Sequence, residues 1–348
     1  MADALRVAVV GTGAFGRNHL RIYSELASEL AAEGVELVAA VEPDDVRAGE
    51  VAEKYSIPVF DSVGALLAAD LRLDAASVTV PTIFHHDVAA ELLAGGVDCL
   101  VEKPIAADLA EADALVELAD REGRVLQVGH LERFNPAVIA AEAGLTRPMF
   151  FEAHRLSVFT PRSLDVDVVL DLMIHDLDIV LTFAKSPVKE VRAVGLPVLS
   201  AKVDIANVRV EFESGCVANF TASRVSTERV RKLRFFEPRR YVSIDYARKD
   251  VLVIGVDAGF SLDAAMAAGA AGGFQDGLPG LSFEKPAITP GEPLRLEILS
   301  FLNAVRTGAE PRVTARQGRE ALGLALEIQR AMVEHAGRAG LGDFFLAG

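Results

Sequence analysis

The chain has 348 residues, of which 51% are hydrophobic and 24% charged, a balance that predicts two globular domains with ample apolar cores. Its formal net charge of −15 argues against broad affinity for nucleic acid or anionic membranes. The sequence has no uninterrupted apolar run of about 18 residues and no signal-peptide pattern at its start, so we expect a cytoplasmic protein. Cys99 and Cys216 lie far apart without the spacing of a metal site, and we expect both thiols to be reduced and no metal to be bound.

The first 130 residues alternate between short β-branched runs and longer helical patterns. Strands are predicted at 6–10, 35–42, 76–80, 98–104 and 124–130, and helices at 19–33, 46–55, 86–96 and 109–123. Repeated βα units of this length predict an α/β fold, with a doubly wound parallel sheet covered by helices on both faces.

Beyond residue 148 the pattern changes to consecutive strands joined by short turns. These strands are predicted at 148–157, 188–199, 204–214, 216–226, 230–238 and 240–247. They predict a second, α+β domain built on a large mixed or antiparallel sheet. The Gly- and Ala-rich segment 258–280 is interpreted as a loop, and helices are predicted at 294–308 and 315–336. We place the domains at 1–130 and 131–312, with a C-terminal helix near 313–338 that packs back on the first domain.

A glycine-rich turn, GTGAFG at 11–16, directly follows the first predicted strand. Its glycines allow a tight turn, close approach of a pyrophosphate and close packing of helix against sheet, and the helix N-terminus attracts the phosphates. Glu42 ends the second strand, where a carboxylate can accept both ribose hydroxyls and repel a 2′-phosphate, which favours NAD over NADP. The predicted contacts of the dinucleotide in this part of the chain are Gly11, Gly13, Ala14, Phe15, Gly16 and Glu42.

Further candidates follow later strands of the same sheet, at the edge where such sheets bind ligands. One strand ends at Glu102 and Lys103, while Pro81, Thr82 and His86 follow the preceding strand. We predict that all five contact the cofactor. A solvated surface lysine and a histidine that only caps its helix are the alternatives.

A polar stripe crosses the otherwise apolar helix predicted at 169–180. At about 100° per residue around the helix axis, His175 lies about 40° from Asp171 on one side, and Asp178 lies about 20° from Asp171 on the other side. Since a helix that is apolar nearly all round is usually buried, the stripe faces a cleft or a satisfied polar pocket. We interpret it as the substrate-side wall of an active site. An (i, i+4) pair that only steadies the helix, and a metal site of the same three side chains, are the alternatives.

The chain resembles the Gfo/Idh/MocA family of nicotinamide-dependent sugar and cyclitol oxidoreductases. The resemblance rests on GTGAFG at 11–16, VEKP at 101–104 and the Asp-x-x-x-His pair of Asp171 and His175. It implies a Rossmann domain, a C-terminal domain whose open sheet often forms an oligomer interface, and therefore a homodimer or homotetramer. One departure is the run at 167–170, which replaces a glycine-rich stretch that often precedes the family's Asp-x-x-x-His.

A narrower resemblance, to UDP-N-acetylglucosamine 3-dehydrogenase-like members, rests on the stretches 128–138, 150–180 and 186–195. It implies oxidation of the 3-hydroxyl of UDP-N-acetylglucosamine, followed by a partner aminotransferase on the way to lipid A variants. The alternatives are a dehydrogenase of inositol, of a simple aldose or of a UDP-sugar uronate. A protein that binds NAD only as a sensor or scaffold is the alternative outside enzymes.

A nucleotide sugar carries two phosphates, so a protein with a net charge of −15 must present local cations to hold them. Five candidates come from segments that lead into the 169–180 helix: His130, Arg133, His154, Arg155 and Arg162. Pairing of two or three of these with carboxylates is expected. The predicted substrate site comprises these five together with Asn135, Lys103, Asp171 and His175.

Oxidation of a secondary alcohol requires hydride transfer to the nicotinamide and removal of the hydroxyl proton. A histidine, whose usual pKa is about 6.5, suits a base near neutral pH better than a lysine, whose usual pKa is about 10.4. We therefore expect His175 to act as the base, kept basic by Asp171 or Asp178. The family resemblance implies that Lys103 contacts both cofactor and substrate, where it would stabilise the developing oxyanion. Exchange of the roles of His175 and Lys103 is the alternative.

Overall fold

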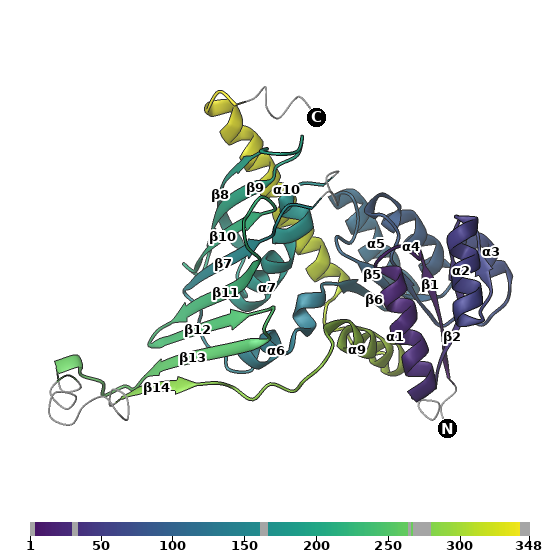
Figure 1. The fold of residues 1–348 in the computed structure, drawn as a ribbon, viewed down its shortest axis with the longest axis horizontal. Coiled ribbons are helices and arrows are strands. Elements are labelled where there is room, and N and C mark those ends of the chain that lie inside the picture. The colour runs from purple at the N-terminus through teal and green to yellow at the C-terminus, as the bar shows by residue number, and fades with distance from the viewer. Residues whose placement is uncertain (1–3, 30–33, 161–165, 264–265, 267–279, 342–348) are drawn as a thin grey trace. The chain divides into compact units, whose positions relative to one another are not determined.

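The computed structural model describes residues 4–29, 34–160, 166–263, 266 and 280–341. The chain divides into two compact units. The first comprises the chain up to Phe134 together with Glu292–Gly323, and the second comprises Asn135–Gly291 and the chain from Leu324 onward. Each unit has its own sheet, a parallel one of six strands and a mixed one of eight, which confirms the predicted fold class (Figure 1).

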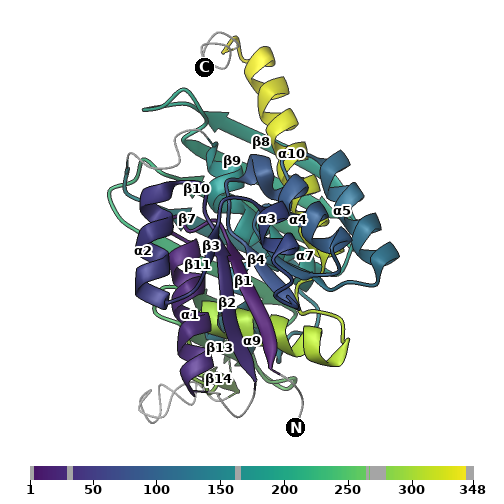
Figure 2. The same cartoon turned by 90° about the vertical axis from the view of Figure 1, so that its right-hand side faces the viewer.

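The sheet of the first unit has the strand order β3-β2-β1-β4-β5-β6 and is parallel throughout. Its strands are β1 (Leu5–Val10), β2 (Val35–Val41), β3 (Val59–Phe60), β4 (Ala75–Val78), β5 (Asp98–Glu102) and β6 (Leu126–Gly129). Its helices are α1 (Gly16–Glu29), α2 (Asp45–Tyr55), α3 (Val63–Ala68), α4 (His85–Ala94), α5 (Leu109–Glu122) and α9 (Pro293–Thr307), with 3-10 turns η1 (Thr82–Phe84) and η2 (Leu131–Phe134). Figure 2 shows α1 and α2 on one side of this sheet and α3, α4 and α5 on the other. The strand order reverses between β1 and β4, which is the switch point where such sheets bind ligands.

Local signals explain most of these helix boundaries. Asp44, Ser62 and Asp108 precede α2, α3 and α5, and each side chain accepts a hydrogen bond from a backbone N–H three residues on. Gly123 ends α5 in the left-handed conformation, with φ 62°. Sequence periodicity predicted every strand of this sheet except β3, and it missed α3. Both elements are too short to show a period.

The position of α9 differs from the predicted domain boundary, which assigned residues up to 312 to the second domain. Ile298, Phe301 and Leu302 of α9 are buried in the same core as Leu20 and Tyr23 of α1. The amphipathic pattern of α9 indicates a buried face, but it carries no information about which core receives that face. The following helix, α10 (Ala315–Arg338), belongs to the first unit only as far as Gly323.

The sheet of the second unit has the order β14-β13-β12-β11-β7-β10-β9-β8, with one parallel pair, β10 and β7. Its strands are β7 (Phe150–Leu156), β8 (Val188–Leu196), β9 (Ile205–Phe212), β10 (Val217–Ser223), β11 (Val230–Glu237), β12 (Arg240–Asp245), β13 (Asp250–Val256) and β14 (Leu281–Glu284). Side chains alternate between a buried face, which holds Phe151, Phe220 and Phe235, and an opposite face that is only partly covered. Residues 264–265 and 267–279 of the segment interpreted as a loop lie outside the described residues.

Helices cover the buried face of this sheet: α6 (Pro136–Glu142), the π-helical turn η3 (Val169–Met173), α7 (Ile174–Ala184) and the later turns of α10 (Figure 1). Gly195 of β8 allows close approach of α10, because a Cβ there would lie 2.3 Å from Met332 Sδ. In the described part of the chain, none of the helices combines the length and apolar character needed to cross a membrane.

Candidate active site

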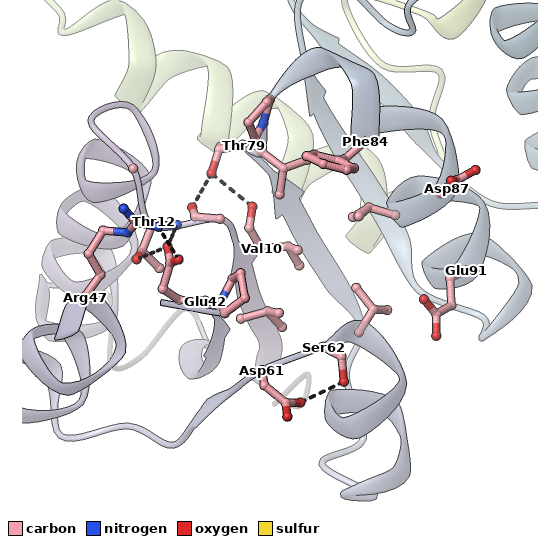
Figure 3. A pocket seen from close by; sticks show the side chains of 18 residues that line it. Val10, Thr12, Glu42, Arg47, Asp61, Ser62, Thr79, Phe84, Asp87 and Glu91 are labelled. Carbon is pink, nitrogen blue, oxygen red and sulfur yellow. Dashed lines mark hydrogen bonds and ion pairs between the residues drawn. The ribbon is translucent and has the colours of Figure 1, made fainter. Parts of the chain in front are cut away.

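A cavity of about 780 Å³ lies at the carboxyl ends of β1, β2 and β4 in the first unit (Figure 3). Four of the residues predicted to contact the cofactor line this cavity: Gly11 and Gly13 of the glycine-rich turn, Glu42 after β2, and Pro81 after β4. The remaining predicted cofactor residues do not line it: Ala14, Phe15, Gly16, Thr82, His86, Glu102 and Lys103.

The glycine-rich turn folds tightly back on the first turn of α1. A Cβ at Gly16 would lie 2.0 Å from the carbonyl oxygen of Gly11, so no larger residue fits there. Thr79 Oγ1 lies 2.6 Å from the same oxygen and donates to it, which anchors the turn to the end of β4. At Gly13, by contrast, a Cβ would meet nothing within 4 Å, so the backbone is open to a ligand. This open backbone at a helix N-terminus fits a dinucleotide pyrophosphate.

Gly16→Ala is expected to weaken NAD binding roughly tenfold or more, because the added methyl group displaces the turn that receives the pyrophosphate. Isothermal titration calorimetry measures the dissociation constant. Gly49→Ala in α2, where a Cβ meets nothing within 4 Å, is the matched control and leaves affinity unchanged. Equal affinity of the two variants would contradict the role assigned to the turn.

Glu42 is a buried, fixed negative charge at the cavity wall (Figure 3). Its Oε2 accepts hydrogen bonds from Thr12 N and Thr12 Oγ1, at 3.0 and 2.7 Å, and its Oε1 accepts from Asp44 N and Arg47 Nη2, at 3.1 and 2.8 Å. Burial opposes ionisation, but the hydrogen bonds from Arg47 and Thr12 outweigh it and lower the pKa of Glu42 to about 2. The four acceptor positions of the carboxylate thus have protein partners, and ribose hydroxyls would compete with them.

Arg47 is the residue at this wall that the sequence reasoning missed. Its guanidinium is half-exposed beside Glu42, where an arginine could accept the 2′-phosphate of NADP. Its position in the first turn of the helix after Glu42 was the available signal. A carboxylate and a guanidinium thus lie side by side at this wall of the cavity.

Glu42→Ala is expected to raise the ratio of kcat/KM with NADP to that with NAD about tenfold or more, because it removes the repelling charge and frees Arg47. Initial rates with each cofactor measure the ratio. Glu50→Gln, which removes an exposed charge of α2 that pairs with Arg17 of α1, is the control. An unchanged ratio in Glu42→Ala would show that Glu42 does not select the cofactor.

The chain after Lys103 is tied to the cavity wall by His85. The Lys103–Pro104 peptide bond is cis. The buried His85 ring places Nδ1 2.8 Å from the Pro104 carbonyl oxygen and Nε2 2.9 Å from the Val80 carbonyl oxygen, and burial lowers the pKa of His85. Its neighbour His86, which is predicted to contact the cofactor, has Nδ1 2.8 Å from Asp87 Oδ1.

In the second unit, the predicted helix at 169–180 begins as a π-helical turn rather than an α-helix. Asp171 lies in this turn, η3, and His175 lies in the first turn of α7. The 100° spacing used for the polar stripe therefore does not hold between Asp171 and His175. Both are half-buried, whereas Asp178 is buried. Single π-turns inside helices are frequent at functional sites.

Asp167, the first residue of the run 167–170 that departs from the pattern of the resembled family, caps this π-turn. Its Oδ1 accepts hydrogen bonds from Val169 N and Leu170 N, at 2.9 and 3.1 Å, and its Oδ2 accepts from Gln329 of α10. The departure from the family pattern thus supplies a side-chain cap for the turn that carries Asp171.

Arg155 is engaged within the second unit. Its Nε donates to Asp176 Oδ2 at 2.7 Å and its Nη2 donates to Asp176 Oδ1 at 3.1 Å, and its guanidinium lies 5.1 Å from the Tyr246 ring centre. Arg155 and Asp176 are only 3% and 2% exposed. The predicted phosphate contact is therefore a buried ion pair, because α7 presents a carboxylate to this face of β7. His154 lies on the opposite face of the strand, so the two cannot serve one site.

Two more of the predicted substrate residues, Arg133 and Asn135, have partners inside the protein. Arg133 Nη2 donates to the Arg312 carbonyl oxygen at 3.2 Å. Asn135 caps α6 by accepting from Ala137 N at 3.1 Å, and its Nδ2 donates to the Tyr246 carbonyl oxygen at 3.1 Å. His130 is buried. Arg162 lies outside the described residues, and among the described ones no group of three or more His, Cys, Asp and Glu is placed to hold a metal ion.

A glycine-rich turn at the switch point of a Rossmann sheet, followed in the chain by a second α/β unit, defines a dinucleotide-dependent oxidoreductase of two domains. Residues 5–130 match the family model of the Gfo/Idh/MocA oxidoreductases with an NAD-binding Rossmann fold, and residues 138–239 match the model of the Gfo/Idh/MocA C-terminal domain. The chain belongs to the Gfo/Idh/MocA family, as its motifs predicted.

Among its relatives is UDP-N-acetylglucosamine 3-dehydrogenase from Acidithiobacillus ferrooxidans, which is 36% identical over 94% of this chain and 97% of the relative. A scyllo-inositol 2-dehydrogenase (NAD(+)) from Bacillus subtilis is 28% identical over 65% of this chain and 69% of its own. A solved structure of the Acidithiobacillus enzyme has a TM-score of 0.82 at 35% identity, covering 95% of this chain and 98% of that one. Levoglucosan dehydrogenase in complex with NADH and levoglucosan, at 16% identity, shares the fold with a TM-score of 0.80, covering 95% and 98% of the two chains.

Proposed function

We propose that this protein is an NAD-dependent dehydrogenase that oxidises the 3-hydroxyl of UDP-N-acetylglucosamine to the 3-keto nucleotide sugar. The observation that carries the proposal is the similarity to UDP-N-acetylglucosamine 3-dehydrogenase, which extends over 94% of the chain at 36% identity. The cavity at the switch point supports the cofactor part, since Gly11, Gly13 and Pro81 line it beside the fixed charge of Glu42. When bound there, NAD supplies the hydride acceptor.

We propose that His175 accepts the hydroxyl proton, that Asp171 keeps its imidazole basic, and that Lys103 stabilises the developing oxyanion. The motifs that carry these residues support the assignment, as does the half-buried state of Asp171 in the π-turn and of His175 in the first turn of α7. Lys103 as the base is the alternative.

A second candidate is a dehydrogenase of inositol or of another neutral polyol or sugar. One observation favours it: Arg155 and Arg133, two of the cations expected at a pyrophosphate, are buried and engaged by Asp176 and by the Arg312 carbonyl oxygen. A neutral polyol needs no such cations. Inositol dehydrogenases are also among the relatives of this chain.

Absorbance at 340 nm with NAD and a substrate panel separates the two candidates. The panel holds UDP-N-acetylglucosamine, its galacto epimer, UDP-N-acetylglucosaminuronate, glucose and myo-inositol, with a carbonyl trap to pull an uphill oxidation forward. The proposal expects NADH formation with UDP-N-acetylglucosamine and a product two hydrogens lighter by mass spectrometry. Signal only with inositol or glucose supports the second candidate. NAD binding without turnover of any substrate supports a sensor or scaffold.

The product ketone suggests the next reaction. A 3-keto nucleotide sugar is a carbonyl acceptor for a pyridoxal-phosphate aminotransferase, which would install nitrogen at that carbon. We propose such an aminotransferase as the pathway partner, in the synthesis of lipid A variants. Coupled turnover, in which added aminotransferase and amino donor increase NADH formation, tests this partner.

The partly covered face of the eight-stranded sheet is the proposed interface of a homodimer or homotetramer. Phe150, Phe236 and Tyr241 lie in register on adjacent strands, with ring centres 5.6 and 5.1 Å apart, and Ile254 and Phe283 continue the row. Phe236 is 38% exposed and Phe283 63% exposed. A row of exposed aromatic side chains on one sheet face is typical of a protein interface.

Phe236→Asp is expected to convert the oligomer to monomers, because it places a charge at the centre of this apolar row. Light scattering coupled to gel filtration measures the mass against 37.1 kDa for one chain. Val333→Asp, which changes an exposed apolar residue of α10, is the matched control. A monomeric parent protein, or an oligomer that survives Phe236→Asp, would contradict the assignment.

A further inference from the structure

A buried chain of hydrogen bonds crosses the first unit beneath the glycine-rich turn. His19 of α1 is 0% exposed, and its Nδ1 lies 3.1 Å from Ser77 Oγ of β4 while its Nε2 lies 3.2 Å from Glu102 Oε1 at the end of β5. The Tyr23 hydroxyl, one turn further along α1, lies 2.9 Å from Ser77 Oγ. Four side chains from three elements are thus joined end to end.

With a neutral His19 ring, hydrogen-bond chemistry gives this chain of hydrogen bonds one direction. A carboxylate only accepts hydrogen bonds, so His19 Nε2 carries a hydrogen atom and donates a hydrogen bond to Glu102. In a neutral imidazole Nδ1 is then an acceptor, and the Ser77 hydroxyl donates to it. Ser77 Oγ in turn accepts from the Tyr23 hydroxyl, which stays protonated because burial raises the pKa of Tyr23. Every donor has one acceptor, and the Nε2–H tautomer of His19 is the one that satisfies all three contacts.

Two neighbours connect this chain to the functional parts of the unit. Phe15, inside the glycine-rich turn, places its ring edge-on to the His19 ring, with the centres 5.4 Å apart. Gly129 of β6 lies opposite Glu102 in the sheet, and a Cβ there would lie 2.8 Å from Glu102 Oε1. The absence of a side chain at Gly129 therefore leaves the space that the Glu102 carboxylate occupies. His19 touches the cofactor turn on one side and the strand end that Lys103 follows on the other.

We propose that His19 is a positioning residue. It joins the glycine-rich turn to the end of β5 at Glu102, and so holds the following residue, Lys103, in position beside the bound cofactor. The inference rests on the proposed function, because it assigns Lys103 to the reaction. The neutral His19 ring bridges the two groups by donating to Glu102 on one side and accepting from Ser77 on the other. The oriented pair of hydrogen bonds, rather than the bulk of the ring, is therefore the feature that matters.

Four variants test this proposal by steady-state kinetics and calorimetry. Two change His19, one changes Gly129, and Gly49→Ala is the control. His19→Gln keeps one donor and one acceptor at the end of its side chain and holds kcat within about threefold of the parent, whereas His19→Leu lowers kcat by about tenfold to a hundredfold. Gly129→Ala, which only pushes the Glu102 carboxylate aside, lowers kcat to a similar degree, and Gly49→Ala does not. All four retain the parent's dissociation constant for NAD within about threefold, since the phosphate-binding backbone is intact.

Parental kcat in both His19→Leu and Gly129→Ala would overturn the proposal. Equal losses in His19→Gln and His19→Leu would also overturn it, since packing of the imidazole would then be the cause. If His19→Leu does not fold, Gly129→Ala against Gly49→Ala decides the question.

A spectroscopic readout separates this inference from the proposed function. The protein has seven histidines, so long-range ¹H–¹⁵N spectra of their rings are simple. The signals that are lost in His19→Gln are those of His19. The neutral Nε2–H tautomer is expected, with a shift of its Nε2 resonance in Gly129→Ala but not in Gly49→Ala. An Nδ1–H tautomer, or no shift in Gly129→Ala, would refute the chain of hydrogen bonds whatever the substrate. If UDP-N-acetylglucosamine is not turned over, the proposed function fails alone, and the kinetic test uses whichever panel substrate is active.

Discussion

His175→Asn is expected to lower kcat by about a hundredfold or more, because asparagine keeps the size and polarity of the side chain but accepts no proton at neutral pH. His175 is half-buried in the first turn of α7, and a variant of this shape leaves the packing of that turn intact. Steady-state assays of NADH formation measure kcat at saturating concentrations of NAD and substrate. His335→Asn, at a half-buried histidine of α10, is the control and keeps the parent's rate.

The pH profile gives the matching evidence. If His175 is the base, kcat rises with pH as the imidazole loses its proton, and this rise is absent in His175→Asn. Lys103→Ala is expected to lower kcat while the rise with pH remains, because Lys103 stabilises charge rather than accepting the proton. Near-normal turnover in His175→Asn together with its loss in Lys103→Ala would reverse the two roles.

Replacement of Arg155 by methionine is expected to reduce the free energy of unfolding of the second unit by about 3–5 kcal/mol, since it leaves the Asp176 carboxylate buried without its partner. The two groups are nearly inaccessible to solvent and form two parallel hydrogen bonds, of 2.7 and 3.1 Å. Urea unfolding followed by circular dichroism measures the change. Arg192→Met, at an exposed pair with Glu190, leaves the midpoint unchanged.

The double variant Arg155→Met with Asp176→Leu sharpens this test. It removes both buried charges and is expected to recover most of the stability lost in Arg155→Met alone. A small loss in Arg155→Met, accompanied by a large rise in KM for the nucleotide sugar, would contradict the structural role and restore Arg155 as a phosphate contact.

Much of the first unit could be predicted from the sequence because its signals are local. β-branched runs mark the strands, and side-chain caps at Asp44 and Asp108 mark where helices begin. The placement of α9 could not be predicted, since it depends on the shape of the core around Leu20 and Tyr23 rather than on its own periodicity. β13 was missed although the run 251–256 carries a clear β-branched signal.

The site was predicted unevenly for similar reasons. The glycine-rich turn is a contiguous motif whose spacing alone specifies a conformation, and its Gly11 and Gly13 line the cavity. Asp176, the partner of Arg155, lies 21 residues away on another element, so no local sequence pattern predicts the pair. The opposite orientation of His154 and Arg155, by contrast, was available from the predicted strand at 148–157, because neighbouring residues on a strand face opposite sides. The π-turn at Asp171 leaves no trace in hydrophobic periodicity.

Deuterium at carbon 3 of the sugar tests the central claim most directly. The protein is incubated with NAD and UDP-N-acetylglucosamine deuterated at that carbon, and the reduced cofactor is analysed by mass spectrometry. Oxidation of the 3-hydroxyl transfers the label, so we expect NADH one mass unit heavier and a nucleotide sugar that has lost its deuterium. Unlabelled NADH, with deuterium retained in the oxidised sugar, would place the reaction at another carbon and contradict the account.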